Sequence, residues 1–346
     1  MKVAIASVQT PFMTGGAEIH ASSLRRELIA RGLEADIVTI PFKWYPPARL
    51  LDTMLMARLV DLSEVNGVRI DRVITLKFPA YYVEHACKVG WLLHQHRQAY
   101  DLYGTAFGDL DRDSEGEAVA AEIRAWDSRY LTEHRALFAN SCTVRDRLRR
   151  YNDIDSEVLY HPPGNAERYR TDGFEDFILA PGRLDPMKRQ HLLVEALSRL
   201  PSGVKAVLIG PTAGDYAEAT IRAARQVGGD RIIVRGVVSE EEKIDLYANC
   251  LAVYNGVYDE DYGYVTLEAF LAGKPVITHE DSGGPLEFVR DGENGYVIPP
   301  SPEAIAACIQ MLADSPATAR AMGGAGRETI GLLNIGWDHV IERLLS

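Results

Sequence analysis

Residues 260–277 read EDYGYVTLEAFLAGKPVI, and this stretch predicts both a fold and a binding site. Glu260 and Glu268 lie on either side of Gly263, in a segment whose helical pattern runs into a short β-type run. A carboxylate in the loop before a helix and another two turns inside it can face one cleft. Between them, the first N–H groups of the helix can bind an anion. A nucleotide-sugar pocket needs carboxylates that bind hydroxyl groups and, beside them, a helix end that binds phosphate. This stretch can supply both.

The two glutamates taken alone also fit a simpler interpretation. Acidic side chains before a helix interact favourably with its dipole, and a glutamate inside a helix is usually solvated. The sequence around them decides between the two interpretations.

Short apolar runs alternate with helical stretches twice along the chain. Residues 3–8 have the pattern of a buried strand, Gly15 and Gly16 end it, and residues 17–32 have helical periodicity. Strands that alternate with helices imply βαβ units and parallel sheets. The predicted fold class is therefore α/β, with two Rossmann-like parallel-sheet domains. The other predicted strands lie in residues 35–40, 72–76, 88–94, 136–141, 157–161, 177–181, 205–210, 231–236, 251–256, 274–279 and 295–300.

The length of 346 residues fits two domains of about 150 residues each. A stretch rich in Pro, Gly and polar residues predicts a linker at 163–174, between an N-terminal domain (1–162) and a C-terminal domain (175–334). The amphipathic segment 335–346 is expected to pack back on the first domain. Ligands bind outside the carboxyl ends of such strands, so the predicted site is a cleft between the two sheets.

Composition excludes several classes of function. A net charge of −12 argues against a nucleic-acid partner, which requires a basic surface. The four cysteines share no short spacing, so neither a zinc site nor a disulfide framework is predicted. The N-terminus is too polar for a secretory signal, and no apolar run approaches the ~18 residues of a membrane helix. We expect a cytoplasmic protein.

Five motifs along the chain belong together, and they are Gly15-Gly16-Ala17-Glu18, His94, GRLDPMK at 182–188, Glu260 with Glu268, and Gly283-Gly284 with Glu287. Each motif is weak singly, but their order and spacing together are specific. With these motifs the chain resembles the retaining glycosyltransferases of the GT-B fold, in glycosyltransferase family 4 (glycosyl transferases group 1). The resemblance implies transfer of a sugar from a nucleotide-sugar donor with retention of configuration, without a metal or other cofactor, and a role in polysaccharide biosynthesis.

The resemblance also implies roles for four catalytic residues. Arg183 and Lys188 neutralise the departing diphosphate in place of a metal ion, since two cations near a strand end suit a group that gains negative charge. Glu260 holds a hydroxyl of the donor sugar. His94 donates a hydrogen bond to the sugar or to the developing charge, although His96 is an alternative.

Further donor contacts follow from the same resemblance. Glu268 accepts hydrogen bonds from the ribose, and the glycine pair 15–16 lets the backbone approach the diphosphate closely. Asp261 replaces a glycine common in the family, which leaves the donor sugar open. The remaining expected donor-binding residues are Gly15, Gly16, Val237 and Val238 (main chain to the base), Tyr262, and the backbone N–H groups of Gly263, Tyr264 and Val265.

The donor base and the acceptor stay open at this point; the donor is expected to be UDP- or GDP-linked. The acceptor could be a glycan, a lipid-linked sugar or a small molecule. Residues 42–60 contain exposed-looking aromatics and Lys43, which could touch a lipid surface and give weak peripheral membrane association; core packing is the alternative. Two other functions compete: a sugar-nucleotide epimerase of the same architecture, and a catalytically silent sugar-nucleotide-binding scaffold.

Overall fold

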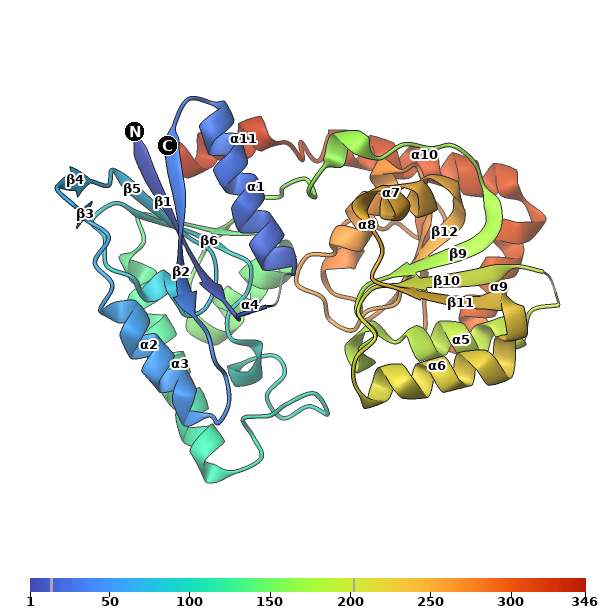
Figure 1. The fold of residues 1–346 in the computed structure, drawn as a ribbon, viewed down its shortest axis with the longest axis horizontal. Coiled ribbons are helices and arrows are strands. Elements are labelled where there is room, and N and C mark those ends of the chain that lie inside the picture. Colours follow the sequence, from blue (N-terminus) through green and yellow to red (C-terminus); the bar gives the residue numbers. More distant parts are fainter. Residues whose placement is uncertain (13–14, 202) are drawn as a thin grey trace. The chain divides into compact units, whose positions relative to one another are not determined.

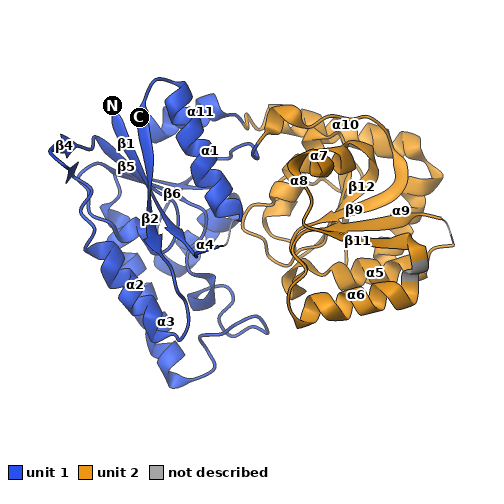
Figure 2. Ribbon diagram, in the orientation of Figure 1, with its two compact units in different colours: residues 1–164, 336–346 blue, residues 165–335 orange. Residues whose placement is uncertain are grey.

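The computed structural model describes residues 1–12, 15–201 and 203–346. Each half of the chain forms a six-stranded parallel sheet with helices on both faces (Figure 1). The chain divides into unit 1, residues 1–164 and 336–346, and unit 2, residues 165–335 (Figure 2). The predicted fold class, α/β with two Rossmann-like parallel sheets, is confirmed.

Unit 1 has the strand order β2-β1-β5-β6-β7-β8, so the order reverses between β1 and β5. Every predicted run of the first half overlaps a strand, and a small antiparallel hairpin, β3–β4, is added. The elements are β1 (Lys2–Gln9), α1 (Gly16–Ala30), β2 (Glu34–Pro41), α2 (Ala48–Arg58), β3 (Glu64–Val65), β4 (Val68–Arg69), β5 (Arg72–Thr75), β6 (Lys88–Leu92), α3 (Ser114–Tyr130), β7 (Ala136–Ala139), α4 (Cys142–Asn152), β8 (Glu157–Val158) and α11 (Trp337–Leu345).

Both faces of the unit 1 sheet are buried, because side chains along a strand alternate between its two faces. Val3 and Ile5 of β1 pack in a core with α1 and α11. Ala4, Ala6 and Val8 point to the opposite face and pack with α2 and α3. The near-continuous apolar run of β1 is what a parallel strand buried on both faces requires.

The C-terminal helix α11 belongs to unit 1. Its residues Val340, Ile341 and Leu344 are buried in the same core as Leu24 and Leu28 of α1. The chain therefore crosses from unit 1 to unit 2 and returns.

The predicted linker is mostly part of unit 2, whose first residue is Asn165. The N–H groups of Asp172 and Gly173 donate to the carbonyl of Ala248. The Thr171 hydroxyl donates to the carbonyl of Ala272 at 2.7 Å. The abundance of Pro and Gly marks irregular backbone here, but that backbone is hydrogen-bonded to the folded unit.

Unit 2 has the strand order β11-β10-β9-β12-β13-β14, which reverses between β9 and β12. In open parallel sheets, ligands bind at such a switch point, outside the carboxyl ends of the strands. The elements are β9 (Glu175–Pro181), a 3₁₀ turn (Pro186–Lys188), α5 (Gln190–Ser198), β10 (Lys205–Ile209), α6 (Asp215–Gly228), β11 (Ile232–Gly236), α7 (Glu240–Asn249), β12 (Cys250–Asn255), α8 (Tyr264–Leu271), β13 (Val276–His279), β14 (Gly295–Ile298), α9 (Pro302–Asp314) and α10 (Pro316–Leu332).

Candidate functional site

The candidate site of unit 2 lies at the β9/β12 switch point, where two loops are joined. The Tyr258 N–H, after β12, donates to the carbonyl of Met187, after β9, at 2.7 Å. Arg189 crosses between the loops as well: its guanidinium donates to the carbonyls of Gly256 and Val257. It also forms a bidentate ion pair with Asp281. The loops that carry the predicted site residues are therefore fixed to each other.

Lys188 and Glu260 meet across these loops as an ion pair. Their side chains keep about 30% and 28% of their surface exposed, so a ligand can reach both. Arg183 is more exposed, at 59%, and pairs with Asp185 at 3.0 Å. Asp185 in turn caps the 3₁₀ turn, accepting from the Met187 N–H. Two cations and two carboxylates thus share one partly open edge of the sheet.

The backbone around Glu260 is held by the glycine pair at 283–284. The Glu260 N–H donates to the carbonyl of Ser282, and its own carbonyl accepts from the Gly284 N–H at 2.8 Å. Gly283 has a φ of 69°, and a Cβ there would lie 2.6 Å from the Glu260 carbonyl oxygen. These glycines therefore shape the loop that presents Glu260.

Helix α8 starts beside Glu260, as the sequence predicted. Gly263 adopts a left-handed conformation, with φ 96°, and forms the N-cap. The helix begins at Tyr264, so the N–H groups of Tyr264 and Val265 belong to its first turn, where backbone donors face outward along the axis. Glu268 stands one turn into the helix, not two as the sequence pattern suggested, because the helix starts only after Gly263.

Glu268 is held by two side chains of α7 that the sequence analysis missed. One carboxylate oxygen accepts from Lys243 Nζ at 3.2 Å and the other from the Tyr247 hydroxyl at 2.7 Å. Burial alone would lower the pKa of Lys243, but the carboxylates of Glu268 and Glu240 raise it. Lys243 and Tyr247 are four residues apart and share one face of α7, which is the only sequence signal that could have found them.

Two predicted donor-binding aromatics, Tyr262 and Tyr264, pack against each other at the start of α8, and of the two Tyr262 is buried. Tyr262 is only 3% exposed and packs edge-on against Tyr264 and Phe288. Burial, and secondarily the charge of Glu268, raises the pKa of the Tyr264 hydroxyl. Any contact of Tyr262 with a donor therefore comes from its backbone, whereas Tyr264 is partly exposed. Asp261, between Glu260 and Tyr262, is partly exposed.

Val237 and Val238 follow β11 at the same carboxyl edge of the sheet, on its outer strand. Gly236 takes a left-handed φ of 69° just before them, and its carbonyl accepts from the Gly210 N–H at 2.8 Å. The Val237 side chain is exposed. The backbone of this turn is thus available to a ligand, but no described hydrogen bond ties it to Lys188 or Glu260.

In unit 1, the predicted glycine pair stands at the start of α1. Gly15 is the N-cap, its N–H donates to Glu18 at 2.8 Å, and Gly16 is the first helical residue. Gly15 has an extended φ of −139°, and a Cβ there would meet only the Glu18 carboxylate at an ordinary 3.5 Å. No contact among the described residues requires a glycine at position 15. The close approach of a ligand to this backbone stays a prediction.

The structure separates the two histidines that follow β6. His96 packs against the rings of Phe42 and Phe78. Burial, and secondarily the nearby His94, lowers the pKa of His96 to about 3. His94 and His96 are both partly exposed, and the Nδ1 of His94 lies 2.6 Å from the carbonyl of Gln95. The two rings have different neighbours, and the assignment of the active-site histidine to His94 stays a prediction.

A buried carboxylate anchors the loop that carries His94. Asp127 of α3 accepts hydrogen bonds from the hydroxyls of Tyr81, Tyr82 and Tyr100. The Gln95 amide lies 3.4 Å from the same carboxylate. Asp127 thus ties residues before β6, Tyr81 and Tyr82, to residues after His94, Gln95 and Tyr100.

The described residues contain neither a cluster of metal-binding side chains nor a helix that could span a membrane. Residues 1–12, 15–201 and 203–346 contain no group of three or more His, Cys, Asp or Glu arranged to hold a metal ion. In the same ranges, every helix is too short or too polar to cross a bilayer. Metal independence stays a prediction.

The chain is similar to known proteins in both sequence and fold. Residues 165–329, nearly all of unit 2, match the sequence profile described as "Glycosyl transferases group 1". A D-inositol 3-phosphate glycosyltransferase of Streptomyces bingchenggensis is 28% identical, over 94% of this chain and 82% of the relative.

Solved structures with the same fold cover the whole chain. Sucrose-phosphate synthase of Thermosynechococcus elongatus superposes with a TM-score of 0.79 at 20% identity, over 99% of this chain and 97% of that one. HepE of Anabaena, solved with UDP and glucose, has a TM-score of 0.71 at 18% identity over all of both chains. The chain is therefore a glycosyltransferase of the GT-B fold, and its residues 165–329 resemble the glycosyl transferases group 1.

Proposed function

We propose that the protein transfers a sugar, with retention of configuration and without a metal, from a nucleoside diphosphate donor bound by unit 2. The observation that supports this most is the arrangement at the β9/β12 switch point. There Lys188 and Glu260 form an ion pair beside the first turn of α8, and Glu268 stands within that helix. Cations and helix N–H groups suit the diphosphate, and the two carboxylates suit hydroxyls.

In this proposal, the donor replaces the ion pair of the ligand-free site with its own contacts to the same side chains. Without a ligand, Glu260 neutralises Lys188. With the donor bound, Lys188 and Arg183 face the diphosphate, Glu260 accepts from a sugar hydroxyl, and Glu268 accepts from the ribose. As the bond between the anomeric carbon and the phosphate oxygen breaks, negative charge grows on the phosphate. A fixed cation stabilises that charge more than it stabilises the ground state.

Retention follows if the acceptor attacks on the face from which the diphosphate leaves. The acceptor oxygen bonds to the anomeric carbon, and its proton passes to an oxygen of the leaving phosphate. The step then needs no side-chain base, because the phosphate is the base. His94 would donate a hydrogen bond to the sugar or to the developing charge.

The comparisons suggest where to start with substrates. The similar protein HepE has been solved with UDP-glucose, so UDP-hexoses are the first donors to test. Relatives named D-inositol 3-phosphate glycosyltransferase add a phosphorylated polyol to the acceptor candidates. We also propose that the protein is cytoplasmic and that its site is accessible to both the donor and the acceptor.

Replacing Glu268 by Ala tests the donor assignment. Loss of charge-assisted hydrogen bonds, worth about 1.5–3 kcal/mol, should lower kcat/KM for the donor by roughly 10- to 150-fold. The measurement is nucleoside diphosphate release from a panel of nucleotide sugars, with and without acceptors. Glu293→Ala is the matched control, since that glutamate pairs with Arg290 at the surface of the same unit. Wild-type donor kinetics in Glu268→Ala would refute the assignment.

The same panel separates the competing functions. Slow release of nucleoside diphosphate in water alone indicates a transferase without its acceptor. An isomerised donor indicates an epimerase, and binding without turnover indicates a scaffold.

A further inference from the structure

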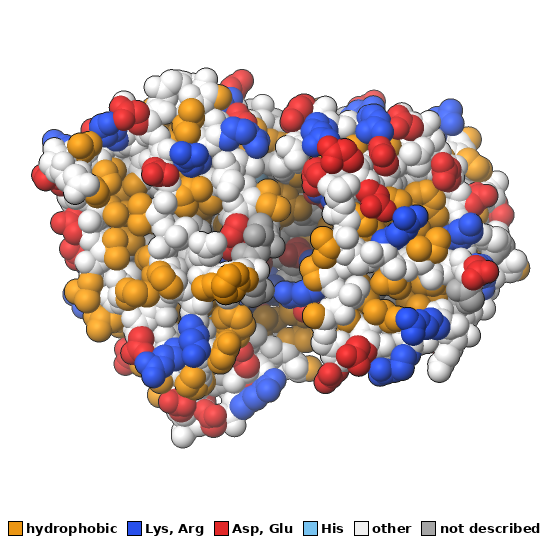
Figure 3. Space-filling view, viewed as in Figure 1, with side chains coloured by type: hydrophobic (Ala, Val, Ile, Leu, Met, Phe, Trp, Pro, Cys, Tyr) orange, Lys and Arg blue, Asp and Glu red, His pale blue; other side chains and the backbone are white. Residues whose placement is uncertain are grey.

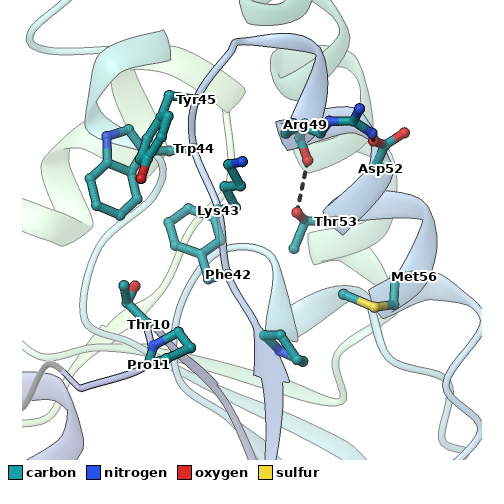
Figure 4. A pocket seen from close by; sticks show the side chains of 11 residues that line it. Thr10, Pro11, Phe42, Lys43, Trp44, Tyr45, Arg49, Asp52, Thr53 and Met56 are labelled. Carbon is teal, nitrogen blue, oxygen red and sulfur yellow. Dashed lines mark hydrogen bonds and ion pairs between the residues drawn. The ribbon is translucent and has the colours of Figure 1, made fainter.

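Unit 1 contains a pocket of about 710 Å³ that the donor chemistry does not use (Figure 4). It lies where β1 and β2 end, so it opens at the carboxyl edge of the unit 1 sheet. Figure 4 shows Trp44 and Tyr45 on one side, Arg49 and Asp52 of α2 on another, and Lys43 and Phe42 between them. We call it the aromatic pocket. Its volume is in the range of small-molecule sites.

Two of the aromatic rings of this pocket are exposed to solvent. Trp44 and Tyr45 keep 37% and 59% of their surface exposed. Trp44 stacks on Phe42, with ring centroids 6.2 Å apart and planes inclined by 27°, so its orientation is fixed. An aromatic face carries negative charge density and attracts the polarised C–H groups on one side of a sugar ring. Grouped exposed aromatics in a hollow are typical of binding sites.

The pocket also contains a cation that is not neutralised. Arg49 pairs with Asp52 at 2.5 Å. Lys43 has no carboxylate within ion-pair distance among the described residues, and its Nζ lies 5.1 Å from the centre of the Tyr45 ring. In a chain of net charge −12, an isolated lysine beside an aromatic wall favours an anionic ligand there.

The pocket adjoins the loop that carries the candidate histidine. The ring centroids of Phe42 and His96 lie 6.4 Å apart, and His96 lies two residues after His94. The pocket follows β1 and β2, and His94 follows β6. Both therefore lie at the carboxyl edge of the unit 1 sheet.

We propose that the aromatic pocket binds the sugar acceptor, and that this acceptor is a sugar or polyol that carries an anionic group. Trp44 receives the C–H face of its ring, and Lys43 neutralises its charge. This inference rests on the proposed transferase function and narrows it to one class of acceptor.

A membrane surface is the competing occupant. Figure 3 shows hydrophobic side chains beside Lys and Arg side chains on the surface of unit 1. The hollow shape favours a small anionic molecule, because an anionic lipid surface binds best to several unpaired cations, whereas of the two cations that line the pocket Arg49 is paired with Asp52.

The test compares anionic acceptors with their neutral parents. The probes are hexose phosphates, inositol phosphates and hexuronic acids, each beside the neutral sugar or polyol, with the donor that the protein hydrolyses in water. At least one anionic member should raise nucleoside diphosphate release by tenfold or more over water and over its neutral parent. Lys43→Met should then raise KM for that acceptor roughly 10- to 100-fold and leave KM for the donor unchanged.

Matched variants make the result specific. Lys43→Arg should restore most of the acceptor affinity, and Trp44→Ala should weaken charged and neutral acceptors alike. Leu59→Ala removes an exposed side chain just beyond α2 and should change nothing. Equal use of neutral parents, or an unchanged acceptor KM in Lys43→Met, overturns the proposal. So does Lys43-dependent pelleting with anionic vesicles when no acceptor responds. Failure of the transferase function itself would look different, since no donor would then bind or release nucleoside diphosphate.

Discussion

Unit 1 and unit 2 are built on the same six-stranded parallel sheet, but the loops at their carboxyl edges carry different chemistry. In unit 2, the side chains at the switch point are charged and paired with each other, as Lys188 is with Glu260 and Lys243 with Glu268. In unit 1, the pocket presents the rings of Phe42, Trp44 and Tyr45, and its lysine has no carboxylate partner among the described residues. One scaffold therefore supports two kinds of recognition, because loops can change while the sheet stays.

The tryptophans make this comparison measurable. All four, at positions 44, 91, 126 and 337, lie in unit 1. Tryptophan fluorescence therefore follows the unfolding of unit 1 alone, and binding of nucleotides reports on unit 2.

The largest effect is expected for Lys188→Ala. Removal of a fixed cation from the developing charge should lower kcat about 100- to 1,000-fold, as loss of one such group does elsewhere. Steady-state kinetics with the best donor measures it. Lys205→Ala, at the opposite edge of the same sheet, is the control. A wild-type kcat in Lys188→Ala would mean that the charged edge of unit 2 is not where the diphosphate leaves.

Leu344→Ala should damage unit 1 and spare unit 2. This side chain of α11 is fully buried against unit 1, so truncation should cost about 2–5 kcal/mol of unfolding free energy. Urea unfolding followed by tryptophan fluorescence should show the loss, and the affinity for nucleoside diphosphates should stay unchanged. Exposed Leu332 of α10 is the control position. An unchanged fluorescence transition would contradict the packing of α11 on unit 1.

Asp127 should make the stability of unit 1 depend on pH. Burial raises the pKa of this carboxyl to about 6, although hydrogen bonds from Tyr82, Tyr81 and Tyr100 oppose the shift. The unfolded chain loses this proton near pH 4, before the folded state does. Stability should therefore fall by up to about 3 kcal/mol between pH 4 and pH 6 and level off above.

The variant Asp127→Asn isolates that contribution. It cannot titrate, so the difference in unfolding free energy between wild type and variant should change across this pH window. A constant difference from pH 4 to pH 7 would show that Asp127 is already ionised in the folded state at pH 4.

Tyr247→Phe should give the smallest effect. It removes one hydrogen bond to Glu268 and leaves the contact with Lys243. A loss of about 0.5–1.5 kcal/mol should raise the donor KM roughly 2- to 12-fold and leave kcat unchanged. Donor titrations at saturating acceptor measure both constants. A fall in kcat with constant KM would assign Tyr247 to the chemical step.

The sequence predicted the sheets and part of the unit 2 site for clear physical reasons. Buried parallel strands are apolar on both faces, so runs such as residues 177–181 stand out between polar helices. Lys188 and Glu260 come after strands, and the carboxyl ends of parallel strands share one edge. Their ion pair is thus a consequence of strand order.

Other features depend on packing that a linear pattern does not contain. Lys243 and Tyr247 reach Glu268 only because α7 packs beside α8. Tyr262 is itself a predicted donor-binding residue, but its ring is buried and packs against Phe288. Residues 165–174 have the composition of a linker, yet their backbone pairs with unit 2.

A crystal structure of the protein with UDP tests the donor site most directly. The diphosphate should lie at Lys188, Arg183 and the first turn of α8, with the ribose hydroxyls on Glu268 and the Lys188–Glu260 pair opened. UDP bound at any other part of unit 2, with Lys188 still paired to Glu260 and Glu268 still held only by Lys243 and Tyr247, would contradict this assignment.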